Sequence, residues 1–313
     1  MDLNQILKSL PSADRELVQT QVPLRDLTSL GVGGPAALIC SLENAEQAQR
    51  FHEIVQKAGK SLFILGGGSN VLADDAGFNG IVLKVTAQDF QVRGDIVTVG
   101  AGYDFDDLIA KTLDSGLTGL EFASGIPGTL GGAVVGNAGC YGHEIGEFFI
   151  DAQVLRPDGT VVTAGPEAFG FRYRETDLRE TGHVVLEVRL KLNRGDVHAA
   201  GDTRAEKIAD RRRKHPVGLP SAGSWFRNLP PAAAGERRRA AGSFLEAAGA
   251  KEMSAGNAHV FAKHANMIIN GGMATSADVL RLAECMKKAV KDKFDLTLIE
   301  EVRYLCNEPE TEE

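Results

Sequence analysis

The chain has 313 residues, of which 43% are hydrophobic and 24% are charged, and its formal net charge at pH 7 is −8. This length and apolar content predict two or three subdomains around a substantial core. The negative charge argues against general affinity for nucleic acid, and no run approaches the ~18 apolar residues of a membrane span. We therefore expect a cytoplasmic protein without membrane contact, and a monomer.

The first half of the chain is predicted to alternate between helices and strands. Apolar periodicity indicates helices over 44–58 and 105–115, and strands over 61–65, 81–85 and 96–99. Strands then dominate from 146 to 192, with half-buried alternation over 149–155 and 184–192 and a turn at Pro157-Asp158-Gly159.

The second half is predicted to contain more helix. Thr203 and Glu206 have the spacing of a capping box, which places the start of a basic helix at Thr203 and its end near Lys214. The run Arg237-Arg238-Arg239 fits a solvated helix face. Further expected elements are helices over 240–248 and 276–293, strands over 259–261, 266–270 and 296–305, and a frayed tail over 309–313. The last strand would place Glu301 and Arg303 on one face.

Glycine is strongly enriched: 36 of the 313 residues are glycine, about 12%, against an average near 7%. It gathers in three clusters, at 31–35, 66–70 and 125–139. Glycine lets the main chain approach a ligand closely and lets successive amides point at phosphate oxygens. The three clusters therefore predict one large phosphorylated ligand.

A nicotinamide-binding Rossmann unit is the first alternative for these glycines. Gly66-x-Gly68 follows an apolar strand, as that fingerprint requires, but a helix should begin directly after it. The residues over 70–80 are rich in turn formers and lead into another strand. We therefore expect a phosphate loop between strands instead of a Rossmann unit.

Ser224 is the candidate proton donor. It stands between glycine and aromatic residues, shortly after the basic run Arg211-Arg212-Arg213-Lys214, and a hydroxyl held close to a developing carbanion can deliver a proton. Structural alternatives exist for each candidate taken alone: turn hydrogen bonds for Ser221 and Ser224, a surface salt bridge for Arg174, pairing with Arg303 for Glu301, and a buried structural role for His264.

Eight motifs in a fixed order resemble the UDP-N-acetylenolpyruvoylglucosamine reductase (MurB) family over residues 20–306. They are Gly33-Gly34-Pro35-Ala36, Gly66-Gly67-Gly68-Ser69-Asn70-Val71-Leu72, Gly125-Ile126-Pro127-Gly128-Thr129-Leu130-Gly131-Gly132, Asn137-Ala138-Gly139-Cys140-Tyr141-Gly142, Phe171-Arg172-Tyr173-Arg174, Gly223-Ser224-Trp225-Phe226-Arg227-Asn228, Lys263-His264-Ala265-Asn266 and Glu301-Val302-Arg303. No loop is inserted after Arg174, so the chain resembles the shorter, second type of the family. It departs from the family pattern at Val135-Gly136, at Ser243 and over 251–257.

The resemblance implies an α+β fold: a two-subdomain FAD-binding fold of the vanillyl-alcohol-oxidase/PCMH type plus a C-terminal α+β substrate domain. The expected bounds are 1–85 and 86–203 for the two FAD-binding subdomains and 204–313 for the substrate domain. The implied reaction reduces the enolpyruvyl group of UDP-N-acetylglucosamine enolpyruvate to give UDP-N-acetylmuramate for peptidoglycan synthesis. FAD would be bound, NADPH would donate the hydride, and the UDP-sugar would be the partner.

The resemblance also implies roles for individual residues. Arg174 would neutralise charge on the substrate, Ser224 would donate the proton to C2 and Glu301 would be the acid of the last strand, while Lys214 and Asn228 would contact the diphosphate. The cofactor-binding residues would be Gly66, Gly67, Gly68, Ser69, Asn70, Val71, Leu72, Gly125, Ile126, Pro127, Gly128, Thr129, Gly131, Gly132, Asn137 and Gly139. Two rivals remain: another FAD oxidoreductase with the same cofactor fold, such as an alcohol oxidase, and a nucleotide-binding protein without activity.

Overall fold

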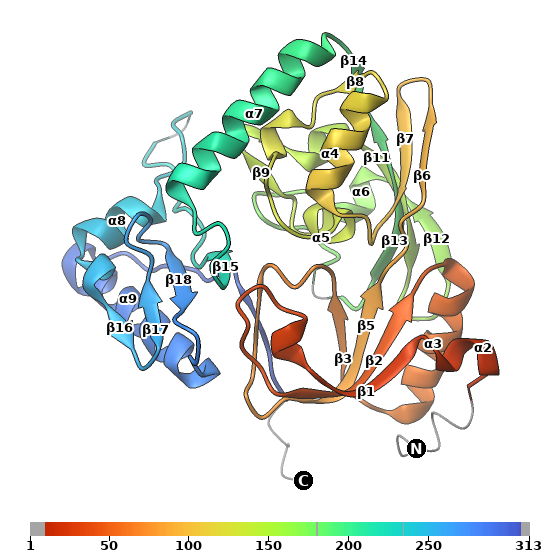
Figure 1. Ribbon diagram of the computed structural model, residues 1–313, viewed down its shortest axis with the longest axis horizontal. Coiled ribbons are helices and arrows are strands. Elements are labelled where there is room, and N and C mark those ends of the chain that lie inside the picture. The colour runs from red at the N-terminus through yellow and green to blue at the C-terminus, as the bar shows by residue number, and fades with distance from the viewer. Residues whose placement is uncertain (1–9, 180, 234, 308–313) are drawn as a thin grey trace. The chain divides into compact units, whose positions relative to one another are not determined.

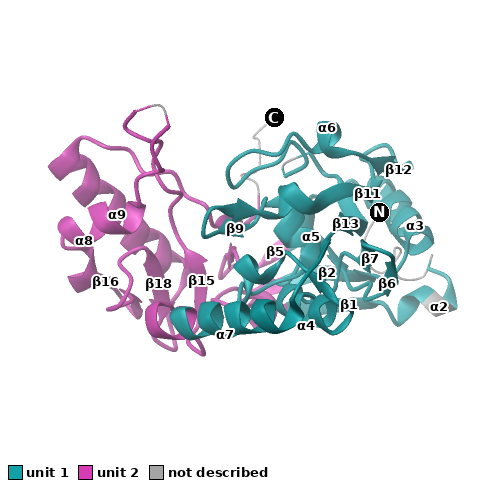
Figure 2. Ribbon diagram, turned by 90° about the horizontal axis from the view of Figure 1, so that it is seen from above, with its two compact units in different colours: residues 1–22, 36–67, 79–210 teal, residues 23–35, 68–78, 211–313 magenta. Residues whose placement is uncertain are grey.

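The computed structural model describes residues 10–179, 181–233 and 235–307 (Figure 1). The chain divides into two compact units, coloured separately in Figure 2. Unit 1 comprises Met1–Val22, Ala36–Gly67 and Asn79–Asp210, and unit 2 comprises Pro23–Pro35, Gly68–Phe78 and Arg211–Glu313. Among the described residues, no helix is long and apolar enough to cross a membrane.

The first sheet of unit 1 has four strands in the order β1-β2-β5-β3, with β3 parallel to β5. Its strands are β1 (Val18–Pro23), β2 (Pro35–Leu42), β5 (Phe78–Val85) and β3 (Leu62–Leu65), and the helices α2 (Ser12–Arg15) and α3 (Ala45–Ala58) belong to the same part of the chain. The side chain of Asn44 caps α3 by accepting a hydrogen bond from the Gln47 N–H. Phe51 of α3 is buried in one core with Leu83 of β5. The amphipathic pattern that predicted this helix therefore reflects its packing in that core.

The second sheet of unit 1 has five antiparallel strands in the order β12-β11-β13-β7-β6. They are β12 (Val161–Ala164), β11 (Phe149–Leu155), β13 (Val184–Lys191), β7 (Ile96–Gly100) and β6 (Phe90–Arg93). The same unit holds the helices α4 (Phe105–Asp114), α5 (Leu130–Val135) and α6 (Pro166–Phe169), and the short strand pairs β9 (Gly139–Cys140) with β10 (His143–Glu144) and β8 (Leu117–Thr118) with β14 (Asn193–Arg194). Buried side chains of both sheets share one core.

Unit 2 is built on a four-stranded antiparallel sheet in the order β15-β18-β17-β16. Its strands are β15 (Ser221–Ser224), β18 (Met267–Asn270), β17 (Ala258–Val260) and β16 (Ser254–Ala255), and its helices are α8 (Ala241–Ala247) and α9 (Ser276–Phe294). A capping box of Thr275 and Asp278 starts α9, and this helix confirms the one predicted over 276–293. A parallel pair of short strands, β4 (Val71–Ala73) and β19 (Arg303–Leu305), brings the segment after the second glycine cluster to the end of the chain.

The predicted start of the basic helix is wrong by about two turns. The helix α7 spans Val197–Lys214, and the Asp196 carboxylate accepts the N–H groups of His198 and Ala199 at 2.9 and 3.2 Å. Thr203 lies inside the helix, where its hydroxyl donates to the Ala199 carbonyl. Asp196 therefore satisfies the first free N–H groups of the helix, and the capping-box spacing at Thr203 is coincidental.

Two further predictions in the second half are wrong. The expected strand over 296–305 is regular only in β19, because β4 pairs with just three residues. Glu301 lies outside this strand, so strand alternation does not place it on the same face as Arg303. The arginine run 237–239 is not helical: Arg238 and Arg239 donate to the carbonyls of Asn228 and Pro230. The predicted tail over 309–313 lies outside the described residues.

Candidate active site

Two glycine-rich loops of unit 1 lie in backbone contact. A Cβ on Gly67 would fall 2.7 Å from the Gly128 Cα, and one on Gly66 would fall 2.8 Å from the Thr129 hydroxyl oxygen. Neither Gly66 nor Gly67 has a positive φ, so close approach is the reason for glycine at these positions. The contact brings the second and third glycine clusters together as main chain without side chains, here called the glycine cradle. Such main chain suits a phosphate-bearing cofactor.

The rest of the second cluster is held within unit 2. A Cβ on Gly68 would fall 2.0 Å from the Leu27 carbonyl oxygen, and the Gly68 carbonyl accepts the Ser29 N–H at 3.0 Å. No helix follows the glycines, as the sequence predicts; the short strand β4, which the sequence did not predict, follows them, and the expected strand over 81–85 lies in β5. The rejection of a Rossmann fingerprint is therefore confirmed.

An ion pair that the sequence did not reveal supports the third cluster. The Asp106 carboxylate accepts the Gly125 N–H at 2.6 Å and two guanidinium N–H groups of Arg204. Hydrogen bonding to Asp106 raises the pKa of Arg204, so the guanidinium stays charged at neutral pH. Asp106 and Arg204 are 98 residues apart, and nothing in the local sequence signals that they pair.

Asn137 and Arg174 tie the end of the third cluster to the segment 170–179. Asn137 is fully buried; its amide donates to the Arg172 carbonyl at 2.9 Å and accepts the Gly146 N–H at 3.2 Å. The Arg174 guanidinium donates to the Gly139 carbonyl, and Arg174 itself has a positive φ of 57°. Such a conformation is uncommon for a residue with a side chain and is often found at functional sites.

Ser224 and Glu301 belong to unit 2 and are linked through the backbone of Trp225. Ser224 ends β15, and the Trp225 carbonyl that follows it accepts the Glu301 N–H at 2.8 Å. Arg174 belongs to unit 1. Within unit 2, the structure thus brings the candidate proton donor and the candidate acid onto adjoining segments.

Asn266 is a site residue whose role the sequence did not reveal. It is buried, its carbonyl accepts the Trp225 N–H at 2.8 Å, and its side-chain amide exchanges two hydrogen bonds with the backbone of Phe226 at 2.8 and 2.9 Å. These bonds hold the segment that follows Ser224. The motif Lys263-His264-Ala265-Asn266 was the available signal, but only the fold shows what the asparagine contacts.

The two predicted diphosphate contacts also lie in unit 2. Lys214 is exposed at the end of α7. The Asn228 side chain accepts the N–H of Ala241, the first residue of α8, at 3.1 Å. The Asn228 side chain therefore stabilises the start of α8, in addition to the diphosphate contact that the motif implies.

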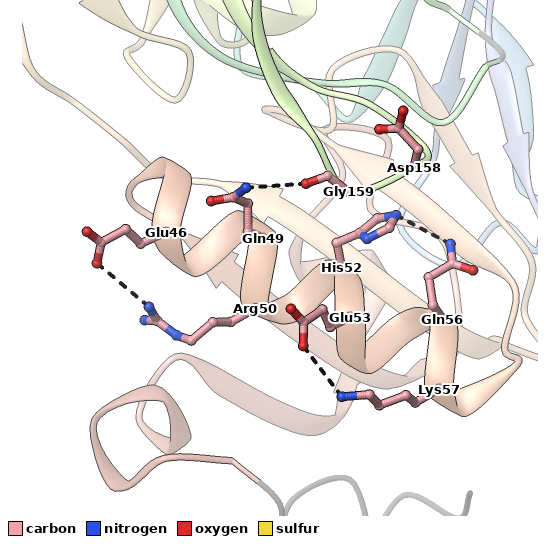
Figure 3. Close-up of a pocket in the computed structure, with 9 residues that line it drawn as sticks. All are labelled: Glu46, Gln49, Arg50, His52, Glu53, Gln56, Lys57, Asp158 and Gly159. Carbon is pink, nitrogen blue, oxygen red and sulfur yellow. Dashed lines mark hydrogen bonds and ion pairs between the residues drawn. The ribbon is translucent and has the colours of Figure 1, made fainter.

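A surface hollow elsewhere in unit 1 contains none of the predicted site residues. It is lined by α3 and by the turn at Asp158 and Gly159 (Figure 3), and it measures about 650 Å³. Gln49 donates to the Gly159 carbonyl and Lys57 pairs with Glu53, so polar side chains there bind each other. The hollow is a polar surface feature distinct from the glycine cradle.

His264 is held in its neutral form. Its Nδ1 accepts the Asn266 N–H at 3.3 Å, and burial lowers its pKa from the ordinary value of 6.5. The unfolded chain binds a proton on this residue near pH 6.5, whereas the folded protein does so only at lower pH. Its contribution to stability is therefore present above pH 6.5 and is lost as the pH falls towards the lowered value.

We expect the melting temperature of the protein to fall on acidification from pH 7 more steeply than that of His264→Asn. The asparagine oxygen can accept the same N–H but does not titrate, so the difference between the two proteins isolates His264 from other groups. A difference on the order of 1 kcal/mol, or about 2–4 °C, is expected. Parallel melting profiles from pH 7 to pH 5 would contradict this account.

Nearly the whole chain is similar to known proteins. Residues 36–165 match an FAD binding domain, and residues 215–305 match the C-terminal domain of UDP-N-acetylenolpyruvoylglucosamine reductase. The chain is 36% identical over 297 residues to the reductase of Bacillus velezensis, which covers 93% of this chain and 96% of that protein. It is 34% identical to the reductase of Clostridium novyi, with 99% and 98% covered. The crystal structure of the reductase (MurB) from Thermus caldophilus superposes with a TM-score of 0.78 at 32% identity, covering 92% of this chain and 99% of that one.

The FAD binding domain and the backbone cradle together define an FAD-dependent oxidoreductase. Identity above 30% over more than nine-tenths of the chain makes it a member of the UDP-N-acetylenolpyruvoylglucosamine reductase family. The expected α+β class, an FAD-binding fold followed by a C-terminal substrate domain, is confirmed. The flavin cofactor and a UDP-sugar of peptidoglycan synthesis as substrate follow from that membership.

Proposed function

We propose how this chain carries out the reaction of its family, the reduction of UDP-N-acetylglucosamine enolpyruvate to UDP-N-acetylmuramate. NADPH is the source of the hydride, and Arg174, Ser224 and Glu301 act on the enolpyruvyl group. The observation that carries the proposal is the hydrogen bond between the Glu301 N–H and the Trp225 carbonyl. It joins the segments of the donor and the acid inside the domain that matches the reductase.

The residues of the glycine cradle fit FAD. Gly66, Gly67 and Gly128 offer main chain without side chains, and a Cβ on either of the first two would fill the space between the loops. The bound flavin supplies hydride transfer from NADPH to C3 of the substrate. The protein contributes placement, electrostatics and the proton.

The charges and the hydroxyl fit the second half of the reduction. Hydride addition at C3 leaves negative charge beside the substrate carboxylate, and the Arg174 guanidinium neutralises it. Glu301, protonated or hydrogen-bonded, stabilises the same oxygens. Ser224 donates its proton to C2, which completes the addition across the double bond.

The remaining assignments concern binding and context. Lys214 and Asn228 bind the diphosphate of the UDP-sugar, since a cation and an amide are suitable donors to phosphate oxygens. We propose two FAD-binding subdomains over 1–85 and 86–203 and a substrate domain over 204–313. The enzyme acts as a monomer in the cytoplasm, where its product supports cell wall biogenesis, cell shape and cell division.

The test is substrate-dependent oxidation of NADPH by the purified protein. A yellow protein that consumes NADPH only when the UDP-enolpyruvyl sugar is present is the expected result. A flavoprotein with no such consumption would favour another FAD oxidoreductase, such as an alcohol oxidase. A colourless protein that takes up no added FAD would favour nucleotide binding without catalysis.

A further inference from the structure

Asn70 is connected to the backbone around Glu301 by two hydrogen bonds. Its side-chain Nδ2 donates to the Glu301 carbonyl at 3.1 Å, and its own carbonyl accepts the Arg303 N–H at 3.1 Å. These bonds lie on either side of Val302, directly before the pairing of β19 with β4. Asn70 therefore holds the peptide on the C-terminal side of Glu301.

The N-terminal side of Glu301 is held by the segment that follows Ser224. The Trp225 carbonyl accepts the Glu301 N–H at 2.8 Å, and the Arg227 N–H donates to the Ile299 carbonyl at 2.8 Å. Residues 296–302 form no regular strand, only an isolated bridge at Glu300. A few individual hydrogen bonds, and not a continuous β-ladder, therefore decide how the Glu301 backbone is oriented.

Asn70 is itself held in place by its neighbours. Gly68, two residues before Asn70, has no room for a side chain, and the Gly68 carbonyl accepts the Ser29 N–H. The following Val71 and Leu72 are buried and pair with Arg303 and Tyr304. Because both sides of Asn70 are packed, its amide can impose a position on Glu301.

We infer that Asn70 is a positioning residue for Glu301. By holding the Glu301 backbone, the Asn70 side-chain amide directs the Glu301 carboxyl group towards the substrate. The inference rests on the proposed role of Glu301. The family motif implies an FAD contact for Asn70, and the structure shows in addition that its side-chain Nδ2 donates to the Glu301 carbonyl. The two roles differ in which half-reaction they affect.

The test is Asn70→Asp, which keeps the shape of the side chain but replaces the donor with an oxygen that repels the Glu301 carbonyl. FAD content and flavin reduction by NADPH are expected to stay near their original values, whereas flavin reoxidation by the UDP-sugar slows about 10- to 100-fold. Adding Asn70→Asp to Glu301→Gln is expected to slow reoxidation little further, because both changes act on one group. Asn70→Ser removes the amide without adding charge and serves if the aspartate variant does not fold.

The matched control is Asn307→Asp, since the Asn307 amide donates to the Gly77 carbonyl at 3.3 Å in the same unit. It removes a bond of the same kind and is expected to leave both half-reactions unchanged. Weaker FAD binding in Asn70→Asp, equal losses in both half-reactions, or full additivity with Glu301→Gln would overturn the inference. Normal reoxidation in Glu301→Gln would overturn the proposed role of Glu301 and this inference with it; slow Glu301→Gln beside normal Asn70→Asp would overturn the inference alone.

Discussion

Ser224→Ala is expected to slow the reoxidation of the reduced flavin by the UDP-sugar about 10²- to 10⁴-fold, the usual contribution of a positioned general acid. Reduction of the flavin by NADPH needs no proton on C2 of the sugar, so that half-reaction should stay nearly unchanged. Folding should also be preserved, because the backbone of Ser224 and Trp225 makes the sheet contacts here: Ser224 pairs with Met267, and the Trp225 N–H donates to Asn266.

The two half-reactions can be followed separately by the absorbance of the flavin in a stopped-flow instrument. Ser221→Ala is the matched control, since Ser221 begins the same strand and its hydroxyl accepts a local N–H, that of Gly223 at 3.3 Å. It should leave both rates intact. Equal slowing of both half-reactions by Ser224→Ala would show that the hydroxyl is not the proton donor.

Gly67→Ala is expected to give a protein that retains little FAD and has little activity. The new Cβ would lie 2.7 Å from the Gly128 Cα, a contact with backbone that no side-chain rotation relieves. Separating the two loops costs about 1–3 kcal/mol of stability and opens the cradle in which the cofactor's phosphates are proposed to lie. Flavin content of the purified variant, and the rise in melting temperature on adding FAD, measure the two consequences.

Gly201→Ala is the matched control for this substitution. Gly201 lies within α7, and a Cβ there would have nothing within 4 Å. The change should leave FAD content intact and stabilise the protein by about 0.5–1 kcal/mol, the ordinary gain from alanine in a helix. Full flavin occupancy in Gly67→Ala, with stability like that of Gly201→Ala, would refute the steric account of the cradle.

Local patterns predicted the elements whose signals are themselves local. The helices α3 and α9 are capped by Asn44 and Thr275, whose side chains accept N–H groups of the first turn, and each helix has one apolar face. The basic helix α7 was harder, because it buries no residue and has no periodic signal to mark its beginning. The sequence signature pointed to Thr203 as the cap, whereas the structure shows that Asp196 accepts the first free N–H groups.

The candidate site divides in the same way. Arg174, Ser224 and Glu301 were named because the order of motifs resembles a family, and the family is now established; their individual roles stay predictions. Other residues hold the site in place: Asn266 bonds to the segment after Ser224, and Asp106 bonds to Gly125 and Arg204. No sequence motif predicts these bonding partners. The structural roles of these residues depend on contacts between positions far apart in the chain.

The amino-acid sequence by itself determined the family, the flavin cofactor and the absence of a Rossmann helix after Gly68, because ordered motifs and turn-forming residues are readable along the chain. Only the tertiary structure decided that the loops at Gly67 and Gly128 touch, and that Asn70 holds the Glu301 peptide. The physical reason is that a backbone hydrogen bond or a steric clash depends on positions in space. No local propensity records which carbonyl an amide will reach when the two residues are 231 positions apart in the chain.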